Sequence, residues 1–366
     1  ECMLYLKTED QKKFIEEYFQ CEKSDDIVLL IEKFCPPEGQ HLLQSLREER
    51  YQIAVLGEED GEGNKRGGLN PLQMKVFNAP VDNSLCVTAG PGSGKTHTLI
   101  LRLVKMIHEV GVPPRNILVL AYNRAVVAEL KHRLNDMLSS LGYGQLANEL
   151  KIHTFHSLVQ YSISEKVKDL RVNEWIREFN NAFDENSFIT TSRLGALEYI
   201  FVDEFQDVTE ERYSMLLRLA SETTKIVVIG DPDQSIYGYE RSTEGSSIGA
   251  EPFFLRFKEE MGVKEEYSLL ENYRSHPSII ECAERLIRLN KDRINRPKML
   301  PVHAMANFQG KTGVQIIDIE VFRSDSYIDY LLQNFGENRN LDSGINEVAI
   351  LFRSNDEMYR AFSNIK

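Results

Sequence analysis

The sequence predicts an α/β protein in which helices cover both faces of a parallel β-sheet. From about residue 69 onwards, short apolar runs rich in β-forming residues alternate with helical stretches, an order that favours parallel sheets. A glycine-rich loop, Ala89–Thr96, joins one apolar run to the next helical stretch. A second apolar run, Tyr199–Val202, ends in Asp203 and Glu204. Both features lie at the end of a predicted strand.

Composition limits the class of protein. The chain has 366 residues, of which 42% are hydrophobic and 27% charged, as in an ordinary globular protein. It contains no run of 18 apolar residues, so no membrane span is predicted. The first residues include neither an initiator Met nor a signal peptide, and we expect a piece of a longer chain. Five scattered cysteines without a CxxC pair favour a reducing compartment and argue against a disulfide framework or a zinc site.

The formal net charge of −13 is concentrated near the N-terminus. Residues 1–63 carry 16 acidic and 7 basic side chains, a net charge of −9, which leaves −4 for the rest. Strong acidity usually argues against nucleic-acid binding. Because most of it belongs to the first sixth of the chain, the net charge does not exclude such a partner for the remainder.

Residues 1–56 are predicted to form a helical appendage that packs on a neighbour. Apolar residues recur at helical spacing between Phe14 and Phe19, and Ser24 begins a cluster of good N-cap residues. Residues 57–68 follow, with no apolar side chain among glycines and charged residues. Such a segment buries too little to offset the entropy of ordering, and we expect an acidic glycine-rich linker.

Beyond the linker, the periodicity predicts an alternating series of elements. Strands are predicted at Leu85–Thr88, Ile117–Ala121, Tyr199–Val202, Lys225–Ile229, Val314–Ile319 and Val348–Phe352. Helices are predicted at His97–Val110, Ala125–Leu141, Glu210–Ala220, Ser278–Leu289 and Ser326–Phe335.

The glycine-rich loop has the spacing of a phosphate-binding loop. Its residues are Ala89, Gly90, Pro91, Gly92, Ser93, Gly94, Lys95 and Thr96. The glycines let backbone N–H groups turn towards a phosphate, and the following helix N-terminus adds positive potential. Lys95 is predicted to reach the β- and γ-phosphates of a nucleotide, and the Thr96 hydroxyl to bind Mg²⁺. The pattern therefore predicts a P-loop NTPase.

Hydrolysis also needs a carboxylate on the metal side and a base for water. Asp203 and Glu204 supply both at the end of a buried strand pattern. We predict that Asp203 serves the Mg²⁺ ion and that Glu204 orients the attacking water.

From this point the motifs resemble those of the UvrD/Rep/PcrA-type superfamily 1A DNA helicases. The segments 203–207, 230–238 and 272–275 resemble the second, third and fourth motifs of that family. Residues 69–73 resemble its adenine-reading Q motif, and residues 120–125 and 154–157 its motifs Ia and Ib. Residues 348–355 resemble a strand segment of the second motor domain. The resemblance implies two RecA-like motor domains.

The resemblance also implies roles at the nucleotide. Gln73 would read the adenine edge, and Tyr273 would stack on the base. Gln234 resembles a γ-phosphate sensor, and Arg274 resembles the arginine that the second domain adds to the γ-phosphate. His97 stands where the family often has an arginine, which weakens one adenine contact. Bound ATP and Mg²⁺ follow from these assignments.

On the DNA side, the resemblance implies contacts with single-stranded bases and phosphates. The residues concerned are Tyr122, Asn123, Thr154, His156, Tyr237 and Tyr239. Aromatic rings stack on bases with little regard to sequence, as a translocating motor requires. For His156, a phosphate contact and a helix cap remain open alternatives, whereas Phe155 is predicted to be core. Glu240 stands where the family usually has an arginine, which disfavours a phosphate contact there.

The motif order predicts the domains. Residues 69–265 are predicted to form RecA-like domain 1A with a reduced 1B insertion at about 157–197, and residues 266–366 a partial domain 2A. Motifs V and VI do not appear before the last residue, so we expect a fragment that binds Mg·ATP but hydrolyses it weakly. The parent is predicted to be an ATP-dependent helicase or translocase on single-stranded DNA, with 3′-to-5′ polarity.

Two other classes stay open at this stage. The parent could be the motor part of a helicase–nuclease, or an ATP-dependent switch that does not unwind DNA and that binds a protein partner through residues 1–56. The family resemblance implies a bacterial, cytoplasmic and nucleoid-associated protein with no membrane partner.

Overall fold

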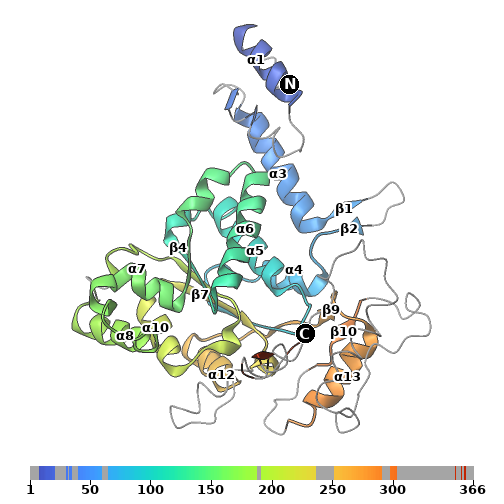
Figure 1. Cartoon of the computed structure of the whole chain (residues 1–366). Helices are drawn as coiled ribbons and strands as arrows, with labels where there is room; N and C mark the ends of the chain where they lie inside the picture. Colours follow the sequence, from blue (N-terminus) through green and yellow to red (C-terminus); the bar gives the residue numbers. More distant parts are fainter. Residues whose placement is uncertain are drawn as a thin grey trace. The chain divides into compact units, whose positions relative to one another are not determined.

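The computed structural model describes most of the first 302 residues. The described residues are 8–20, 30–31, 33–34, 40–59, 65–187, 191–235, 251–290, 297–302, 351, 356 and 358–359. The chain divides into two compact units, Glu1–Gln309 and Gly310–Lys366. All elements described below belong to the first unit (Figure 1).

A parallel sheet of six strands forms the centre of this unit. Its strands are β3 (Leu85–Ala89), β4 (Ile117–Ala121), β5 (Lys151–Thr154), β6 (Tyr199–Val202), β7 (Lys225–Gly230) and β8 (Tyr267–Leu269). They lie in the order β5-β4-β6-β7-β3-β8, and every pair is parallel. The strand that leads into the glycine-rich loop, β3, lies between β7 and β8, so the carboxyl ends of three strands meet beside that loop.

Alternate residues of each strand enter two separate apolar cores. In β4, Ile117 and Val119 belong to one core, whereas Leu118 and Leu120 belong to the other. All four side chains are fully buried. A strand with apolar residues on both faces is typical of a parallel sheet covered on both sides. The predicted fold class is therefore confirmed.

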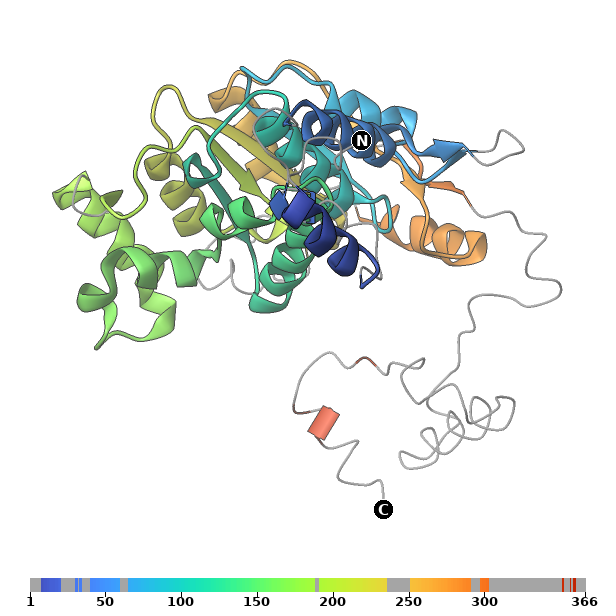
Figure 2. The same ribbon diagram turned by 90° about the horizontal axis from the view of Figure 1, so that it is seen from above.

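Helices form the outer layers (Figures 1 and 2). The first core lies against α4 (Pro71–Phe77), α5 (Lys95–His108) and α6 (Arg124–Ser140). The second lies against α7 (Phe155–Val167), α8 (Trp175–Glu185), α10 (Glu210–Leu219) and α12 (Glu251–Glu260). Short 3₁₀ turns occur at Pro114–Asn116, Gly144–Glu149, Val172–Glu174, Phe205–Asp207 and Pro232–Gln234.

The N-terminal region contributes to the first core. It contains α1 (Thr8–Tyr18) and α3 (Gln40–Leu56), followed by β1 (Glu58–Glu59) and β2 (Lys65–Arg66). Tyr51 and Val55 of α3 are 1% and 5% exposed and pack within the core that includes the central strands. The segment expected to be a plain linker contains an antiparallel pairing of β1 with β2. The fold of α3 is therefore continuous with the sheet domain.

A small structure follows the sheet. It consists of β9 (Glu271–Asn272), α13 (Pro277–Ile287) and β10 (Leu300–Pro301), and β10 pairs in parallel with β9. These residues belong to the part of the chain that was predicted to be the second motor domain. The structure groups these residues with the sheet in one compact unit.

The predicted elements agree with the structure wherever it describes them. The strands predicted around residues 85, 117, 199 and 225 and the helices predicted around 97, 125, 210 and 278 are present within about two residues. The two edge strands β5 and β8 and the helices α4 and α12 were not predicted. The elements predicted at 314–319, 326–335 and, apart from Leu351, 348–352 lie outside the described residues. Within the described residues, none of the helices has the length and hydropathy required to span a membrane.

Candidate active site

The glycine-rich loop has the geometry of an anion cradle. It leaves β3 at Ala89 and enters α5 at Lys95, with Gly94 as the N-cap residue. Gly92 and Gly94 have φ angles of 66° and 79°, in the left-handed region that favours glycine. The unpaired N–H groups at the start of α5 provide positive potential for a phosphate.

Two neighbouring segments approach the loop so closely that side chains are excluded from it. A Cβ atom added to Gly92 would lie 2.7 Å from Cβ of Arg274, and one added to Gly94 would lie 2.5 Å from Nε2 of Gln73. The loop is also bonded to the segment after β9, because Asn272 donates a side-chain hydrogen bond of 2.6 Å to the carbonyl of Pro91. The motifs that the sequence separates by nearly two hundred residues therefore meet at this loop.

Lys95 and Glu204 form an ion pair across the site. Lys95 Nζ lies 2.7 Å from Glu204 Oε2, and Gln206 Nε2 donates to the same oxygen at 2.7 Å. Glu204 is the one non-glycine residue with a positive φ among the described residues, at φ 52° and ψ 49°. Such a backbone costs free energy and is often retained at functional sites. The carboxylate predicted to act as base is thus held in a strained, fixed position.

Asp203 is buried beneath this pair. Its carboxylate is 2% exposed, and Oδ1 accepts the backbone N–H of Glu204 at 2.9 Å. Burial, followed by the neighbouring negative charge of Glu204, raises the pKa of Asp203 to about 6, while Lys95 and the Thr96 hydroxyl lower it. Oδ2 is buried and receives no hydrogen bond from the residues that the structure describes.

These residues fit a magnesium ion. An unpartnered buried carboxylate oxygen is costly unless a cation or proton satisfies it. Thr96 and Asp203 supply one hydroxyl and one carboxylate, and Mg²⁺ in nucleotide sites is commonly held by one or two protein ligands together with phosphates and waters. The described residues contain no cluster of three or more His, Cys, Asp or Glu side chains suited to a metal. A metal bound here would therefore depend on the nucleotide for further ligands.

A hydrogen-bonded network extends the site to the end of β7. Gln206 Oε1 accepts the backbone N–H of Asp231 at 2.9 Å, while its amide nitrogen bonds Glu204. Gln234 Nε2 donates to Asp231 Oδ2 at 2.7 Å. Asp231 is 3% exposed, and burial raises its pKa. The predicted sensor Gln234 is therefore connected to the predicted base through Asp231 and Gln206.

Gln73 has a structural role besides the one predicted. It is 4% exposed and occupies the third position of α4, where Asn70 is the N-cap. Its Oε1 accepts the N–H of Asn70 at 3.0 Å, and its Nε2 donates to the carbonyl of Ser93 at 3.0 Å. The capping box fixes the start of α4. The bond to Ser93 anchors α4 to the glycine-rich loop.

A pocket of about 660 Å³ opens beside the loop. It is lined by Leu56, Gly67, Gly68, Leu69, Asn70, Gln73, Gly92, Gly94, His97, Tyr273 and Arg274. The hydroxyl of Tyr273 is fixed by Asn70, which donates to it at 2.6 Å, and by Glu271, to which it donates at 2.5 Å. Burial lowers the pKa of His97. The pocket brings together the three residues predicted to contact the nucleotide base, Gln73, His97 and Tyr273, and its size suits such a ligand.

Comparison with known proteins agrees with this geometry. Residues 73–240 match the model of a family described as an AAA domain. The YjcD protein of Bacillus subtilis is 26% identical over 62% of this chain and 39% of its own length. DNA helicase II of Haemophilus influenzae is 25% identical over 63% of this chain and 41% of its own, and the ATP-dependent DNA helicase PcrA of B. subtilis is 25% identical over 79% and 48%.

The chain is thus similar to bacterial ATP-dependent DNA helicases, in agreement with the resemblance to the UvrD/Rep/PcrA-type superfamily 1A helicases. It spans less than half the length of the curated relatives named above. The structure brings together the four residues that the sequence predicted for the phosphate and metal site: Lys95, Thr96, Asp203 and Glu204.

The residues that the helicase resemblance assigns to DNA occupy the ends of β4 and β5. The Tyr122 ring is covered on one face by the Arg212 guanidinium, whose centre is 4.9 Å from the ring centroid. Asn123 and Thr154 are the N-cap residues of α6 and α7, and Thr154 is 6% exposed. Their contacts with DNA stay predictions, and so does that of His156. Tyr237 and Tyr239 lie outside the described residues.

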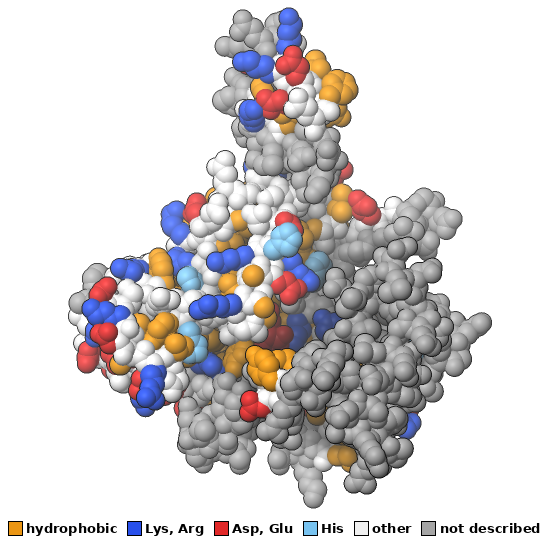
Figure 3. All heavy atoms as spheres, viewed as in Figure 1, with side chains coloured by type: hydrophobic (Ala, Val, Ile, Leu, Met, Phe, Trp, Pro, Cys, Tyr) orange, Lys and Arg blue, Asp and Glu red, His pale blue; other side chains and the backbone are white. Residues whose placement is uncertain are grey.

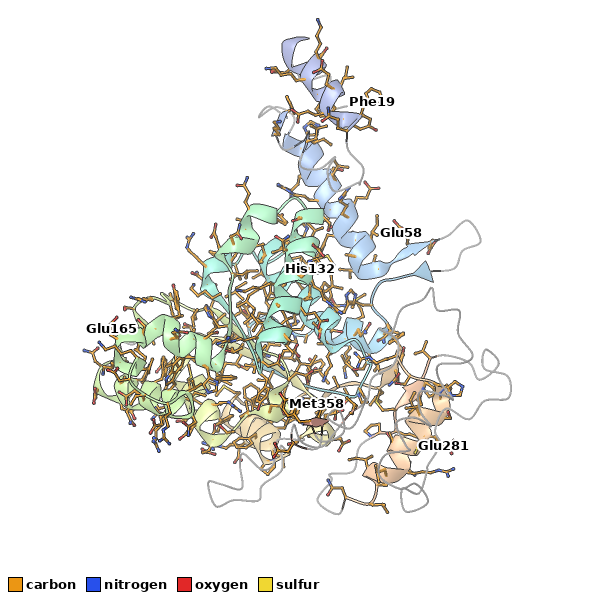
Figure 4. All side chains as sticks on the ribbon, viewed as in Figure 1. Phe19, Glu58, His132, Glu165, Glu281 and Met358 are labelled. Atoms are coloured by element: carbon orange, nitrogen blue, oxygen red, sulfur yellow. The ribbon has the colours of Figure 1, made fainter. Side chains whose placement is uncertain are left out.

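Phe155 and the exposed face of α6 lie next to these residues. Phe155, adjacent to Thr154, is 3% exposed and belongs to the second core, as predicted. The outer face of α6 carries His132, labelled in Figure 4, together with Arg133, which pairs with Glu129 at 2.7 Å. Figure 3 shows basic, acidic and apolar side chains mixed on this face rather than a continuous basic patch.

Sequence reasoning missed three contributors to the site. Gln206 and Asp231 connect the second and third motifs, and Asn272 connects the fourth motif to the P-loop. All three lie inside the recognised motifs, so motif membership was the available signal. Their roles depend on which strands are neighbours, and β6 pairs with β7 only in the folded sheet.

Proposed function

We propose that the protein is the motor of an ATP-dependent DNA helicase or translocase. It binds Mg·ATP, hydrolyses it and uses the energy to move in the 3′-to-5′ direction along single-stranded DNA. The observation that carries the proposal is the assembly of Lys95, Thr96, Asp203 and Glu204 at the carboxyl edge of the sheet. We further propose that it acts in the cytoplasm of a bacterium, on nucleoid DNA, a location that rests on the resemblance to bacterial DNA helicases.

Nucleotide binding requires Lys95 to change partner. In the structure its ammonium pairs with Glu204 at 2.7 Å. Phosphates in the glycine-rich cradle compete for the same ammonium, because they carry more negative charge than one carboxylate. As Lys95 turns to the phosphates, Glu204 keeps its hydrogen bond from Gln206 and becomes available to orient a water molecule. Mg²⁺, held by Thr96 and Asp203, would neutralise charge on the phosphates.

The network beyond Glu204 provides a route for coupling hydrolysis to movement. Gln206 contacts Glu204 and Asp231, and Gln234 contacts Asp231. A change in charge at the phosphates would therefore act on the turn that follows β7. Arg274 would supply a planar cation to the γ-phosphate, since its backbone is fixed beside Gly92 through Asn272. In related nucleotide-hydrolysing enzymes such arginines accelerate the reaction by about 10³–10⁵-fold.

The test is the ATPase rate of a longer chain that contains this sequence, measured with single-stranded DNA, with RNA and without nucleic acid. The proposal expects strong stimulation by DNA and little by RNA. Displacement of a labelled strand from duplexes with a 3′ or a 5′ single-stranded tail then measures unwinding and polarity, with the 3′ tail expected to be required. DNA-stimulated hydrolysis without displacement would indicate a switch or a translocase, and stimulation by RNA alone would contradict the DNA assignment.

A further inference from the structure

The pocket beside the P-loop is closed partly by residues that precede the motor motifs. Leu56, Gly67 and Gly68 line it together with Gln73, His97 and Tyr273. The P-loop glycines at one side of the pocket receive phosphates in the proposed function. The lining that lies away from those glycines therefore faces the sugar and base of the nucleotide. Leu56 brings an apolar side chain, 47% exposed, to this wall.

Helix α3 holds Leu56 in place through several independent contacts. Tyr51, one turn earlier, is 1% exposed, its ring centroid is 4.4 Å from that of His108, and its hydroxyl donates to Glu109 at 2.7 Å. Arg47 and Arg50 donate to backbone carbonyls at the end of α6 at 3.0 and 2.9 Å. The last turns of α3 are therefore fixed against the ends of α5 and α6, and they hold Leu56 in position.

Two glycines bring the returning chain back across the end of α3. The chain leaves α3 through Gly57 at φ 82° and returns through Gly67 and Gly68 at φ 73° and 74°. Figure 4 shows Glu58, the first residue of β1, immediately beyond the end of α3. A Cβ atom at Gly68 would lie 2.5 Å from the carbonyl carbon of Leu56, so only glycine permits this crossing. The N–H of Leu69 then bonds the carbonyl of Val55 at 2.8 Å.

We infer that the end of α3 and the Gly67-Gly68 turn form a wall of the nucleotide-base site, with Leu56 as its apolar contact to a purine. This inference rests on the proposed binding of ATP and adds a determinant of affinity outside the helicase motifs. Leu56 is about half exposed, and a purine ring in the pocket would cover it. The contact involves the base alone, so it changes nucleotide affinity and leaves the phosphate cradle unaltered.

The experiment measures binding of two magnesium-loaded probes to the 366-residue chain by titration calorimetry: a non-hydrolysable ATP analogue and inorganic tripolyphosphate. For Leu56→Ala we expect about fivefold weaker binding of the ATP analogue, from loss of part of an apolar contact, and unchanged binding of tripolyphosphate. Leu255→Ala is the matched control, because Leu255 is 50% exposed on α12 and does not line the pocket. It is expected to change neither value.

The outcomes separate the inference from the proposed function. If Leu56→Ala binds the ATP analogue as tightly as the unchanged protein, or binds both probes equally more weakly, Leu56 does not contact the base. ATP binding by the protein is unaffected by that result. If the unchanged protein binds neither probe, the proposed function fails and the inference fails with it. Unfolding temperatures of the two variants, measured alongside, are expected to match because both side chains are half exposed.

Discussion

Two residues at the site, Glu204 and Asp203, have features that lower the free energy of unfolding. Glu204 has a left-handed backbone, and Asp203 keeps a carboxylate oxygen buried without a partner among the described residues. Either feature lowers the stability of the fold. Both lie next to Lys95 and Thr96, where a nucleotide and a metal would compensate them. The strain is therefore consistent with catalytic use of these residues.

The buried charge of Asp203 leads to a pH-dependent prediction for Asp203→Asn. Because the pKa of Asp203 is raised in the folded state from 3.8 to about 6, its ionisation costs stability as the pH rises through that interval, and the full cost is present above it. Without metal and nucleotide, Asp203→Asn should be more stable than the unchanged protein by about 3 kcal/mol at pH 8 and by much less at pH 4.5. Urea unfolding at the two pH values measures the difference.

The control for this measurement is Asp169→Asn, since Asp169 is exposed on the surface. Its effect should be within about 0.5 kcal/mol at both pH values. A gain for Asp203→Asn that does not change between pH 4.5 and 8 would contradict the assigned cause, and a loss at pH 8 would show that the buried carboxylate stabilises the fold.

For individual residues, the sequence predicted those of the phosphate site but not the contacts that support them. Lys95, Thr96, Asp203 and Glu204 were identified because their chemistry follows directly from residue type and spacing. The second role of Gln73, as a helix cap bonded to Ser93, depends on where α4 meets the loop. No local sequence pattern specifies where α4 contacts the glycine-rich loop.

Among the elements, the central strands were the easiest to predict. The strands β3, β4, β6 and β7 have apolar residues on both faces, and this makes their runs conspicuous. The edge strand β5 has the sequence Lys-Ile-His-Thr and is partly exposed, so it lacks such a run. The other edge strand, β8, has only three residues. Edge position therefore explains why both were missed.

Helix α4 carries Gln73 and is held by one buried arginine of α5. Arg102 is 1% exposed, and its guanidinium donates to the carbonyls of Val76, Phe77, Ala79 and Pro80 at 2.9–3.0 Å. These carbonyls lie at and just beyond the end of α4, where a helix leaves acceptors unpaired. In the sequence, Arg102 lies within the apolar stretch Leu99–Val104 and gives no sign of this role.

Replacing Arg102 by methionine should destabilise the fold by about 3 kcal/mol or more, because a buried guanidinium and its hydrogen bonds to four carbonyls, three of them buried, are lost. Chemical denaturation measures the change. Arg133→Met is the matched control, because Arg133 is an exposed arginine of α6 and its ion pair with Glu129 lies at the surface. The control should change stability by no more than about 0.5 kcal/mol. Equal effects of the two substitutions would contradict the role assigned to Arg102.

In the molecule as a whole, the sheet unit joins parts that are distant in the sequence. The first apolar core combines Tyr51 of α3 with the central strands, and the P-loop contacts both Gln73 and Asn272. Residues 1–56 were predicted to form a helical appendage that packs on a neighbour, but local sequence patterns do not specify which neighbour. The packing of α3 depends on Tyr51 and Val55, two side chains near its end that are buried in the first core.

We propose that Glu204 acts as the base in ATP hydrolysis by a DNA-stimulated motor. The most direct test measures ATP hydrolysis and ATP binding by Glu204→Gln, in a chain that contains this sequence and with saturating single-stranded DNA. We predict a loss of hydrolysis of about 10²–10⁴-fold, with ATP binding retained or tightened because Lys95 no longer pairs with a carboxylate. A variant that hydrolyses ATP at the unchanged rate, or one that fails to bind ATP, would contradict the role of Glu204 as the base.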